Sequence, residues 1–452
     1  MKTSKSFTEA EIAELPKLPD SWRRTKLGEI AYINSGNTPK SLKEAENKGQ
    51  FPFYKVSDMN SEGNETWMKT SNLYLTNDEK VLFKVKEEQK GTIIFPKRGG
   101  AILTNKKRRL SCNASYDLNI MGVKEVSKHI LNGFLWYWFS KLDLRKLYDG
   151  SNVPQINNKD IEPLFFPLPP LPEQRAIVSK IELLFSELDN GISNLKLAQE
   201  QLKVYRQAVL KKAFEGELTQ IQNSITFVQL GKIVEIVSGN TPKGLDTVSN
   251  SGTIQFYKVS DMNLEGNEVE MKYSNIMLTE NELDNLNIKL WPEGTVIFPK
   301  RGGAILTNKK RILSKPSAFD LNIMGVLPND KVDSKYLFYW ILKLDLAKIY
   351  DGSNVPQINK KNIDPLEFPI CLIEEQYAIV QEIETRLSVC DKIEQDIKEN
   401  LEKAEALRQS ILKKAFEGKL LNERELAEVR GAEDWEPAEV LLERIKAERA
   451  KK

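Results

Sequence analysis

The residues best suited to chemistry in this chain are the cations of a fourteen-letter block, FPKRGGAILTNKKR, which occupies residues 95–108 and returns unchanged at residues 298–311. The block holds five Lys and Arg side chains and no carboxylate. Such cations neutralise phosphates and release counterions, and the paired glycines let a backbone turn approach a phosphate closely. Arg can also read guanine, and Asn adenine. One basic run is usually a solvated face, but its retention in two copies, surface letters included, favours DNA binding.

Four further blocks repeat letter for letter, at an offset that changes from 203 to 202 residues before the last of them. They are SGNTPK at 35–40 and 238–243, YKVSDMN at 54–60 and 257–263, DLNIMGV at 117–123 and 320–326, and YDGSNVPQIN at 148–157 and 350–359. The polar residues of SGNTPK and of DGSNVPQIN suit phosphate or base contacts, and they suit ordinary turn and cap chemistry equally well. The candidate DNA-binding residues of the first copy are Asn37, Thr38, Lys97, Arg98, Gly99, Gly100, Asn105, Lys106, Lys107, Arg108, Ser151, Asn152 and Gln155. Those of the second copy are Asn240, Thr241, Lys300, Arg301, Gly302, Gly303, Asn308, Lys309, Lys310, Arg311, Ser353, Asn354 and Gln357.

The chain lacks the residues of common catalytic sites. Its one histidine, His129, has no counterpart in the second copy, which excludes Ser-His-Asp triads and histidine-rich metal sites. We find no Walker A loop, no G-x-S-x-G elbow and no Rossmann glycine motif. We therefore expect no catalytic residue, metal site or cofactor site in this chain.

Composition sets broad limits on the class of protein. The 452 residues carry a formal net charge of only +2, so any nucleic-acid surface must come from local clustering. Three cysteines form no CxxC pair, which fits a reducing compartment. The N-terminal residues lack the apolar region of a secretory signal, and no run approaches the ~18 apolar residues of a membrane span. These features predict a cytoplasmic protein that contacts no membrane.

Each half of the chain is predicted to form a mixed α/β module. Residues 91–99 and 101–105 are rich in apolar β-formers on either side of the Gly-Gly pair, which predicts two short strands around a turn. Residues 132–150 predict an amphipathic helix ended by Gly150, and residues 336–352 repeat it. The aromatic residues of these helices lie within a helical apolar pattern, so we interpret them as core rather than as base-stacking platforms.

A long helix is predicted after each module. The first begins near Pro172 and ends near Gly216, and the second ends near Gly418. Apolar residues recur in both helices at heptad spacing, which predicts that the two pack against each other as an antiparallel coiled coil. The alternative is two separate amphipathic helices, each packed on its own module. The heptad positions are Ile181, Leu188, Leu195, Leu202 and Val209 in the first helix, and Ile383, Cys390, Ile397, Ala404 and Ile411 in the second.

The predicted fold class is therefore α+β, with two repeated mixed α/β modules separated by the helix pair and related by a pseudo-twofold. Residues 1–22 and 421–452 are not repeated, and we expect them to lie together and complete a ring. The predicted divisions are an N-terminal segment 1–22, a first module 23–170, a first long helix 171–218, a second module 219–372, a second long helix 373–420 and a C-terminal helical segment 421–452.

Further paired segments are LGEIAYINSGNTP with LGKIVEIVSGNTP, PLPPLPEQRAIVSKI with FPICLIEEQYAIVQEI, and QAVLKKAFEGEL with QSILKKAFEGKL, and the unpaired EPAEVLLERIKAE lies near the C-terminus. In these segments the chain resembles the specificity subunit of type I restriction–modification systems, and the resemblance covers essentially the whole chain. The second copy departs from the proline-rich pattern at Cys371.

The resemblance implies two target recognition domains that each read half of a bipartite site in double-stranded DNA. It further implies recruitment of two methyltransferase subunits, which form an adenine-N6 methylase, and two motor-nuclease subunits. The chain contains no FxGxG motif for S-adenosylmethionine (SAM) and no NPPY-like or DPPY-like catalytic tetrapeptide. The resemblance therefore implies a non-catalytic subunit of an endonuclease complex, with SAM, ATP and Mg²⁺ held by its partners.

Two other classes of function remain open on the sequence. One is a free-standing sequence-specific DNA-binding protein, and the other is a coiled-coil scaffold whose basic turns bind another polyanion. If the chain is a specificity subunit, the identical blocks predict that both modules read nearly the same short sequence. Twofold symmetry would then require a near-palindromic target.

Overall fold

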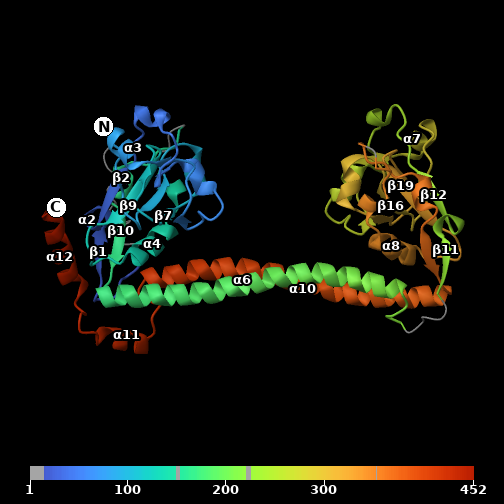
Figure 1. Cartoon of the computed structure of the whole chain (residues 1–452). Coiled ribbons are helices and arrows are strands. Elements are labelled where there is room, and N and C mark those ends of the chain that lie inside the picture. The colour runs from blue at the N-terminus through green and yellow to red at the C-terminus, as the bar shows by residue number, and fades with distance from the viewer. Residues whose placement is uncertain (1–14, 149–152, 220–224, 353, 452) are drawn as a thin grey trace. The chain divides into compact units, whose positions relative to one another are not determined.

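The structure is a computed structural model that describes residues 15–148, 153–219, 225–352 and 354–451. The chain divides into two compact units, of which unit 1 comprises residues 1–193 and 401–452 and unit 2 comprises residues 194–400. Two long helices, α6 (Leu171–Phe214) and α10 (Ile373–Phe416), each contribute one part to both units (Figure 1). Within the described residues, every helix is too short or too polar to cross a membrane.

Unit 1 is a mixed α/β module built on a five-stranded sheet in the order β2-β9-β6-β7-β4. A three-stranded sheet β5-β3-β8 and the pair β1-β10 complete it, and all strand pairs are antiparallel except β3-β8 and β4-β7. The strands are β1 (Arg23–Lys26), β2 (Ala31–Ser35), β3 (Phe51–Tyr54), β4 (Trp67–Met68), β5 (Tyr74–Leu75), β6 (Ile93–Pro96), β7 (Arg108–Leu110), β8 (Ser115–Tyr116), β9 (Ile120–Glu125) and β10 (Phe165–Leu168). The α-helices are α2 (Leu27–Ile30), α3 (Asn77–Leu82), α4 (Asn132–Lys141), α5 (Asn158–Ile161), α11 (Glu423–Arg430) and α12 (Ala438–Ala450), with 3-10 turns η1 (Lys40–Glu44), η2 (Val56–Asn60), η3 (Gly100–Thr104) and η4 (Leu144–Lys146).

The core of unit 1 lies between the five-stranded sheet, α4 and the long helices. Phe134 of α4 is fully buried, and its ring lies 5.7 Å from that of Phe166 in β10 and 5.2 Å from that of Phe416 in α10. Trp138 adds an edge contact with Phe166 at 5.1 Å. The prediction that these aromatic side chains form core is confirmed, and burying such side chains is the main apolar stabilisation of the module.

Two sequence predictions about unit 1 are wrong in detail. Residues 101–105, predicted as a strand, lie mostly in the 3-10 turn η3, because Ile102 turns inward and is fully buried while its neighbours stay on the surface. The helix predicted over 132–150 ends at Lys141, and a separate 3-10 turn, η4, follows. At this helix end, Lys107 of the basic block donates to the carbonyls of Ser140 and Leu142.

Unit 2 repeats this module element by element, with a five-stranded sheet β12-β19-β16-β17-β14, a three-stranded sheet β15-β13-β18 and the pair β11-β20. Its strands are β11 (Thr226–Gln229), β12 (Val234–Ser238), β13 (Ile254–Tyr257), β14 (Glu270–Met271), β15 (Ile276–Leu278), β16 (Val296–Pro299), β17 (Arg311–Leu313), β18 (Ala318–Phe319), β19 (Ile323–Pro328) and β20 (Glu367–Ile370). Its α-helices are α7 (Glu280–Asn285), α8 (Ser334–Lys343) and α9 (Lys360–Ile363), with 3-10 turns η5 (Leu230–Lys232), η6 (Leu245–Thr247), η7 (Val259–Asn263), η8 (Gly302–Thr307) and η9 (Leu346–Lys348). The aromatic trio is also repeated, because the ring of Tyr336 lies 5.7 Å from Phe368 and 5.1 Å from Phe214.

The two long helices start and end in the same way. Each has 44 residues, and each is followed by a glycine with positive φ, 74° at Gly216 and 72° at Gly418. A fully buried glutamine holds each start: Gln174 accepts a hydrogen bond from Leu131 N at 2.8 Å, and Gln376 accepts one from Asp333 N at 2.8 Å. The sequence departure at Cys371 therefore leaves the start of α10 unchanged.

The prediction that the long helices pack against each other is confirmed within each unit. In unit 1, Ile181 of α6 and Ile411 of α10 belong to one hydrophobic cluster. In unit 2, Leu202 of α6 and Cys390 of α10 are both buried and line the same groove. The heptad positions therefore form an interhelical contact, as knobs-into-holes packing requires.

Unit 1 contains a terminal assembly with no copy in the described part of unit 2. Residues 15–22 meet the C-terminal segment, because Ala438 N donates to Ser21 O at 3.0 Å. The buried carboxylate of Glu173 joins the parts, accepting from the indole nitrogens of Trp22 at 2.6 Å and Trp435 at 3.3 Å. Residues 15–22 and the C-terminal segment thus lie together on the start of α6, while residues 1–14 lie outside the described residues.

Candidate nucleic-acid interface

The five repeated blocks, which are spread over 123 positions of the sequence, come together in unit 1. Lys97 Nζ of the basic block donates to Ser35 Oγ of the first block at 2.7 Å, and Lys106 Nζ contacts Asn60 Oδ1 of the second. Main-chain bonds tie the basic block to the fourth and fifth blocks, from Lys97 N to Asn119 O and from Gly99 N to Pro154 O, both 2.8 Å. Residues that are far apart in sequence thus form one continuous surface.

Unit 2 reproduces these contacts with the same atoms. Lys300 Nζ donates to Ser238 Oγ at 2.8 Å, and Lys309 Nζ contacts Asn263 Oδ1. Lys300 N donates to Asn322 O and Gly302 N to Pro356 O, again both at 2.8 Å. The repeat therefore preserves a three-dimensional arrangement as well as five peptides.

The glycine pair in the basic loop combines a conformational requirement with open space. Gly99 and Gly302 have φ of 74° and 71°, a region in which a side chain is strained. Gly100 and Gly303 do not have positive φ, and a Cβ added to either would meet no atom within 4 Å. The fold itself would therefore tolerate alanine at the second glycine, and its retention in both copies points to close approach by something outside the chain.

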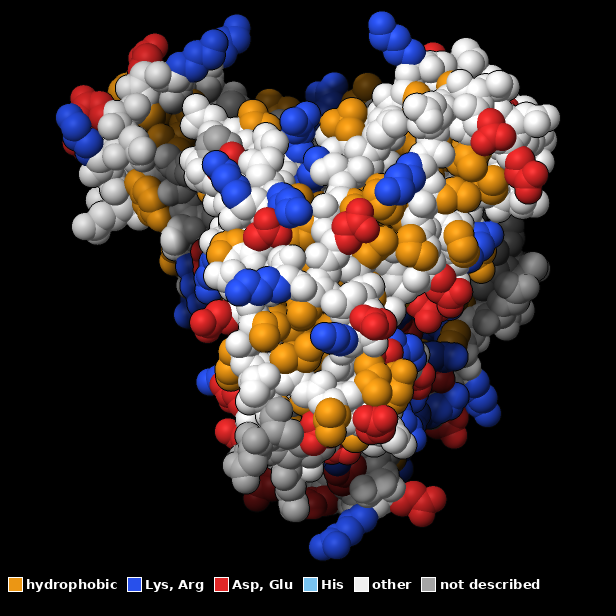
Figure 2. Space-filling model, turned by 90° about the vertical axis from the view of Figure 1, so that its right-hand side faces the viewer, with side chains coloured by type: hydrophobic (Ala, Val, Ile, Leu, Met, Phe, Trp, Pro, Cys, Tyr) orange, Lys and Arg blue, Asp and Glu red, His pale blue; other side chains and the backbone are white. Residues whose placement is uncertain are grey.

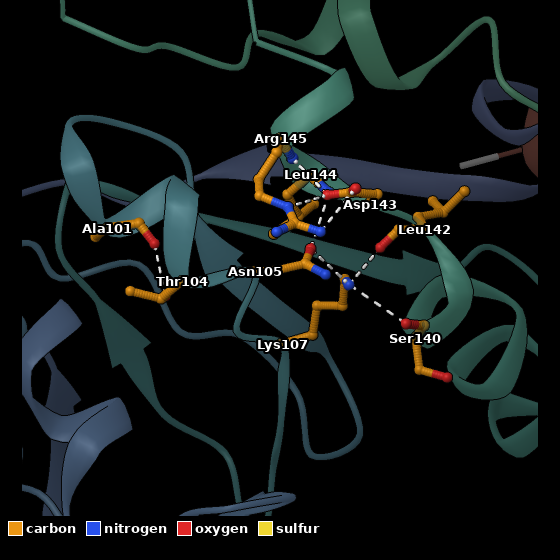
Figure 3. Close-up of polar contacts among 9 residues, drawn as sticks. All are labelled: Ala101, Thr104, Asn105, Lys107, Ser140, Leu142, Asp143, Leu144 and Arg145. Atoms are coloured by element: carbon orange, nitrogen blue, oxygen red, sulfur yellow. Dashed lines mark hydrogen bonds and ion pairs between the residues drawn. The ribbon is translucent and has the colours of Figure 1, made fainter. Parts of the chain in front are cut away.

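Lys107 is an internal strut, contrary to its predicted place among the phosphate-binding cations. Its side chain is 6% exposed, and its ammonium group donates to Ser140 O at 3.3 Å, to Asn105 Oδ1 at 3.0 Å and to Leu142 O (Figure 3). The lysine thus satisfies carbonyls at the C-terminal end of α4, which explains why this helix stops at Lys141. Burial lowers the pKa of Lys107 to about 8. A buried ammonium already engaged with protein oxygens cannot reach a phosphate.

Lys310 repeats this role at the end of α8. It is 1% exposed and donates to Leu344 O at 2.5 Å and to Asn308 Oδ1 at 2.7 Å, and burial lowers its pKa to about 8. The desolvation that lowers both pKa values works against the charged form, whereas the carbonyl partners favour it. Lys107 and Lys310 therefore leave the candidate DNA-binding set.

Asn105 and Arg108, predicted readers of adenine and guanine, also face the protein. Asn105 has φ of 55°, and its Oδ1 accepts from Leu144 N at 2.9 Å as well as from Lys107 (Figure 3). Arg108 donates to Lys107 O at 2.8 Å and to Met59 O at 3.1 Å. Paired readout of a base needs both polar atoms of the amide or the fork of the guanidinium. Here the amide oxygen of Asn105 and the two terminal nitrogens of Arg108 are already engaged within the protein.

In the second copy, Asn308 and Arg311 also bind main-chain groups of the protein. Asn308 Oδ1 accepts from Leu346 N at 2.9 Å, and Arg311 donates to Lys310 O at 2.7 Å and to Met262 O at 3.1 Å. These four Asn and Arg side chains shape the loop, and we assign them no base contact.

We give the name shared surface to a set of exposed or half-exposed residues of the repeated blocks. In unit 1 its members are Ser35, Asn37, Thr38, Asn60, Lys97, Arg98, Gly99, Gly100, Leu103, Lys106 and Gln155. In unit 2 they are Ser238, Asn240, Thr241, Asn263, Lys300, Arg301, Gly302, Gly303, Leu306, Lys309 and Gln357. Asn354 is exposed beside the second set, whereas the predicted residues Ser151, Asn152 and Ser353 lie outside the described residues.

Two kinds of member were missed by sequence reasoning. Leu103 and Leu306 are 53% and 61% exposed at the tips of their loops, held out by the fully buried isoleucines that precede them. Ser35 and Asn60, with their counterparts, take part through contacts with lysines far away in sequence. Exact retention of an apolar letter on a basic turn was the signal available for the leucines, because a surface leucine without a role is free to vary.

The charge of the basic loops differs from that of the surface around them. On the face of unit 2 turned to the viewer in Figure 2, basic and acidic side chains are intermixed with hydrophobic ones. Residues 298–311 contain no carboxylate, and burial beside Arg301 lowers the pKa of Lys300. Phosphate groups placed against such a cluster would be attracted over a distance of about a Debye length, ~8–10 Å at moderate salt.

Comparison with known proteins gives the class to which this arrangement belongs. Residues 19–197 and 223–403 each match the Type I restriction modification DNA specificity domain. The chain therefore belongs to this family and carries its domain twice.

Full-length relatives and solved structures agree with the family. The type I restriction enzyme EcoDI specificity subunit of Escherichia coli is 26% identical over 460 residues, which cover 96% of each chain. The HsdS subunit of Thermoanaerobacter tengcongensis superposes with a TM-score of 0.60 at 19% identity, covering 89% of this chain and 98% of that subunit. A chain from a structure of a type I R-M system, described for its complex assembly and conformational transition, has a TM-score of 0.69 at 18% identity and covers 89% and 100%. The structural matches show a common fold.

Proposed function

We propose that each unit reads one half of a bipartite site in double-stranded DNA through its shared surface. The observation that carries this proposal is the convergence of five identical blocks, held by the same hydrogen bonds, into one carboxylate-poor basic patch in each unit. Lys97, Arg98 and Lys106 would contact phosphates, while the amides and the exposed leucine reach base edges.

In this proposal the chain supplies recognition and its partners supply catalysis. The partners are two methyltransferase subunits, which would modify adenine N6, and two motor-nuclease subunits. SAM, ATP and Mg²⁺ would be bound by those partners rather than by this chain. Such a complex would act on DNA in the cytoplasm.

The long helices supply the surface that we propose for the methyltransferase subunits. In unit 2, Leu197 and Val204 lie one heptad apart on α6 and are 57% and 70% exposed. Beside them a groove runs between Tyr205, Val389 and Ile393. In unit 1, Leu183 and Leu407 are also more than half exposed. Large apolar side chains at heptad spacing outside the α6–α10 contact are typical of a helix face that packs on another protein.

A free-standing DNA-binding protein is the alternative that these exposed apolar residues disfavour. The test is selection of binding sites from a random duplex library by the chain alone and by the chain with its methyltransferase subunits. We expect weak, unspecific binding by the chain alone and enrichment of one bipartite motif by the complex. Equal enrichment without partners would identify a free-standing reader, and no enrichment under either condition would rule out the proposal.

The helix pair is proposed to set the distance between the half-sites. Inserting four residues after Leu195 and four at the matching position of α10 lengthens each helix by ~6 Å. That corresponds to about two base pairs, at ~3.4 Å each. The gap in the selected motif should grow accordingly, and an unchanged gap would show that the helices do not determine it.

A further inference from the structure

We infer that the two half-sites have the same sequence in inverted orientation, so that the target of this chain is an interrupted palindrome. The inference rests on the proposed function and specifies its substrate. It rests on three observations. The residues of the shared surface are identical in the two units, residues 41–53 and 77–91 differ from their counterparts, and the ion pairs between α6 and α10 are repeated with the two helices exchanged.

The stretches that differ between the copies keep their structure while their letters change. Residues 41–53 and 77–91 of unit 1 meet through Glu46 N, which donates to Glu79 Oε1 at 2.8 Å. In unit 2, Ser249 N donates to Glu282 Oε1 at 2.7 Å in the same place. Each pair of stretches surrounds its own small hydrophobic cluster, consisting of Leu42, Phe53, Leu75, Phe83 and Val85 in unit 1 and Leu245, Phe256, Leu278, Ile288 and Ala318 in unit 2.

This is the behaviour expected of scaffold, in which only the packing and the hydrogen bonds have to be maintained. The shared surface behaves in the opposite way, because its outward side chains are identical although packing makes no demand on them. Leu103 and Leu306 show this most directly, since more than half of each side chain touches nothing in its own unit. Identical donors, acceptors and apolar tips present one pattern, and one pattern selects one base sequence.

The contacts of the long helices supply the orientation. In unit 1, Arg408 of α10 forms an ion pair with Asp189 of α6. In unit 2, Arg206 of α6 pairs with Asp391 of α10 at 2.7 Å. Each residue of the second pair is the repeat counterpart of one in the first, 202 positions away, and the helices have exchanged roles. Like helices that pair by such an exchange run antiparallel, and two copies of one reader joined through antiparallel helices would require an inverted repeat in the DNA.

Two differences border the shared surface and define where symmetry could fail. Arg145 follows the carbonyls held by Lys107 and forms an ion pair with Asp143 at 2.8 Å (Figure 3). Its counterpart in unit 2 is Ala347, and there Asp345 accepts from the main-chain N of Ala347 and pairs with Lys348 at 3.8 Å.

The second difference is Ser61, which follows Asn60 and is replaced by Leu264 in unit 2. An asymmetric motif should therefore differ only at base pairs next to these two positions.

The test is selection from a random duplex library by the complex with its methyltransferase subunits, followed by modification sequencing of host DNA. The expected motif has two short halves, a fixed gap and identity with its own reverse complement. A specific motif with two unrelated halves would overturn this inference while leaving the proposed function standing. Absence of any motif would overturn both.

A chimera tests whether the divergent stretches or the shared surface determine which base sequence is bound. Residues 41–53 and 77–91 are replaced by residues 244–256 and 280–294, so that unit 1 carries the stretches of unit 2. The selected motif should not change, and the affinity for the first half-site should fall by less than about fivefold, the smallest effect expected when a base contact is removed. A new preference at the first half-site, in a chimera that unfolds with the native transition, would place the readers in the divergent stretches. The selection with the native chain decides the question if the chimera does not fold.

Discussion

The shared surface and the cleft beside the long helices have diverged to different extents in the two modules. The cleft lies between each module and the long helices. In unit 1 the guanidinium of Arg109 lies there over the rings of Trp67 at 3.9 Å and Trp136 at 4.8 Å. In unit 2 the corresponding cleft contains Ile312 in place of the arginine, and Lys335 pairs with Glu384 at 2.8 Å. The residues of the shared surface, in contrast, are identical in the two units.

The identity of the shared surface is unusual for exposed residues, which normally vary because little in the fold depends on them. Many buried residues are also retained, as at Ile102 and Ile305 or at Phe166 and Phe368, and a few change, as at Phe134 and Tyr336. Packing explains why buried residues are retained. It does not explain why exposed Leu103 has an identical counterpart, and we attribute that identity to a ligand common to both units.

The largest effect should come from removing the buried strut. Lys107→Met leaves the carbonyls of Ser140 and Leu142 without this donor and removes one of the two donors to the amide oxygen of Asn105, which keeps Leu144 N. The free energy of unfolding of unit 1 should fall by about 1–3 kcal/mol, the cost of unsatisfied buried polar groups. Denaturant unfolding of the full chain, followed by tryptophan fluorescence, measures this loss. Lys106→Met is the matched control on the neighbouring, half-exposed lysine, and an equal loss in that control would contradict the assignment.

The exposed lysines should instead affect DNA binding. Replacing Lys106 and Lys309 by Ala removes two cations from the shared surface, one in each unit. The slope of log affinity against log salt should become shallower by up to ~2, because each phosphate that is no longer neutralised lowers the slope by ~0.9. Binding titrations of the complex at several salt concentrations measure it, with stability essentially unchanged. The pair Lys107→Met and Lys310→Met should leave the slope unaltered, so a change there would place the buried lysines on DNA.

The second glycine tests close approach. In Gly100→Ala with Gly303→Ala the added methyl groups meet no protein atom, so the unfolding transition should not move. If a DNA strand approaches the loop, affinity should fall by about tenfold for each half-site, the size of the effect of removing one specific interaction. Gly191→Ala, also in open space but on α6, serves as the control with unchanged binding. Native affinity in the double variant would mean that nothing comes close to the loop.

The smallest effect should come from the cleft beside the long helices in unit 1. Arg109→Ile installs the residue of unit 2 and removes the cation–π contacts, which are worth about 0.5–1 kcal/mol at a partly exposed site. The stability of unit 1 should fall by that amount, and the selected DNA motif should stay the same. A changed first half-site in this variant would show that the cleft takes part in DNA recognition. It would weaken the contrast between the cleft and the shared surface.

Much of this architecture could be predicted because each sequence pattern that indicates an element occurs in both halves of the chain. The heptads from Ile181 and Ile383, the glycines after the long helices and the aromatic core of α4 follow patterns that depend on local periodicity and burial alone. The site was predicted as individual residues of three of the five blocks, without the means to tell inward from outward side chains. Which of their side chains face outward depends on contacts such as that between Lys97 and Ser35, 62 positions apart, which no local pattern encodes.

By itself the sequence determined that the chain is duplicated, that each copy is an α/β module followed by a long heptad helix, and that the repeated surface letters matter. Only the tertiary structure decided between Lys106 and Lys107. They are the same residue type at adjacent positions, and they reach opposite sides of the loop because Asn105 adopts a left-handed conformation and α4 ends beneath it. Lys107 is buried and binds the carbonyls at a helix end, so it has a structural role. Lys106 is half-exposed, and its ammonium group can reach a phosphate from solvent. The difference between the two lysines depends on Ser140 and Leu142, which lie 33 and 35 positions from Lys107 along the chain. It therefore exists only once the chain has folded.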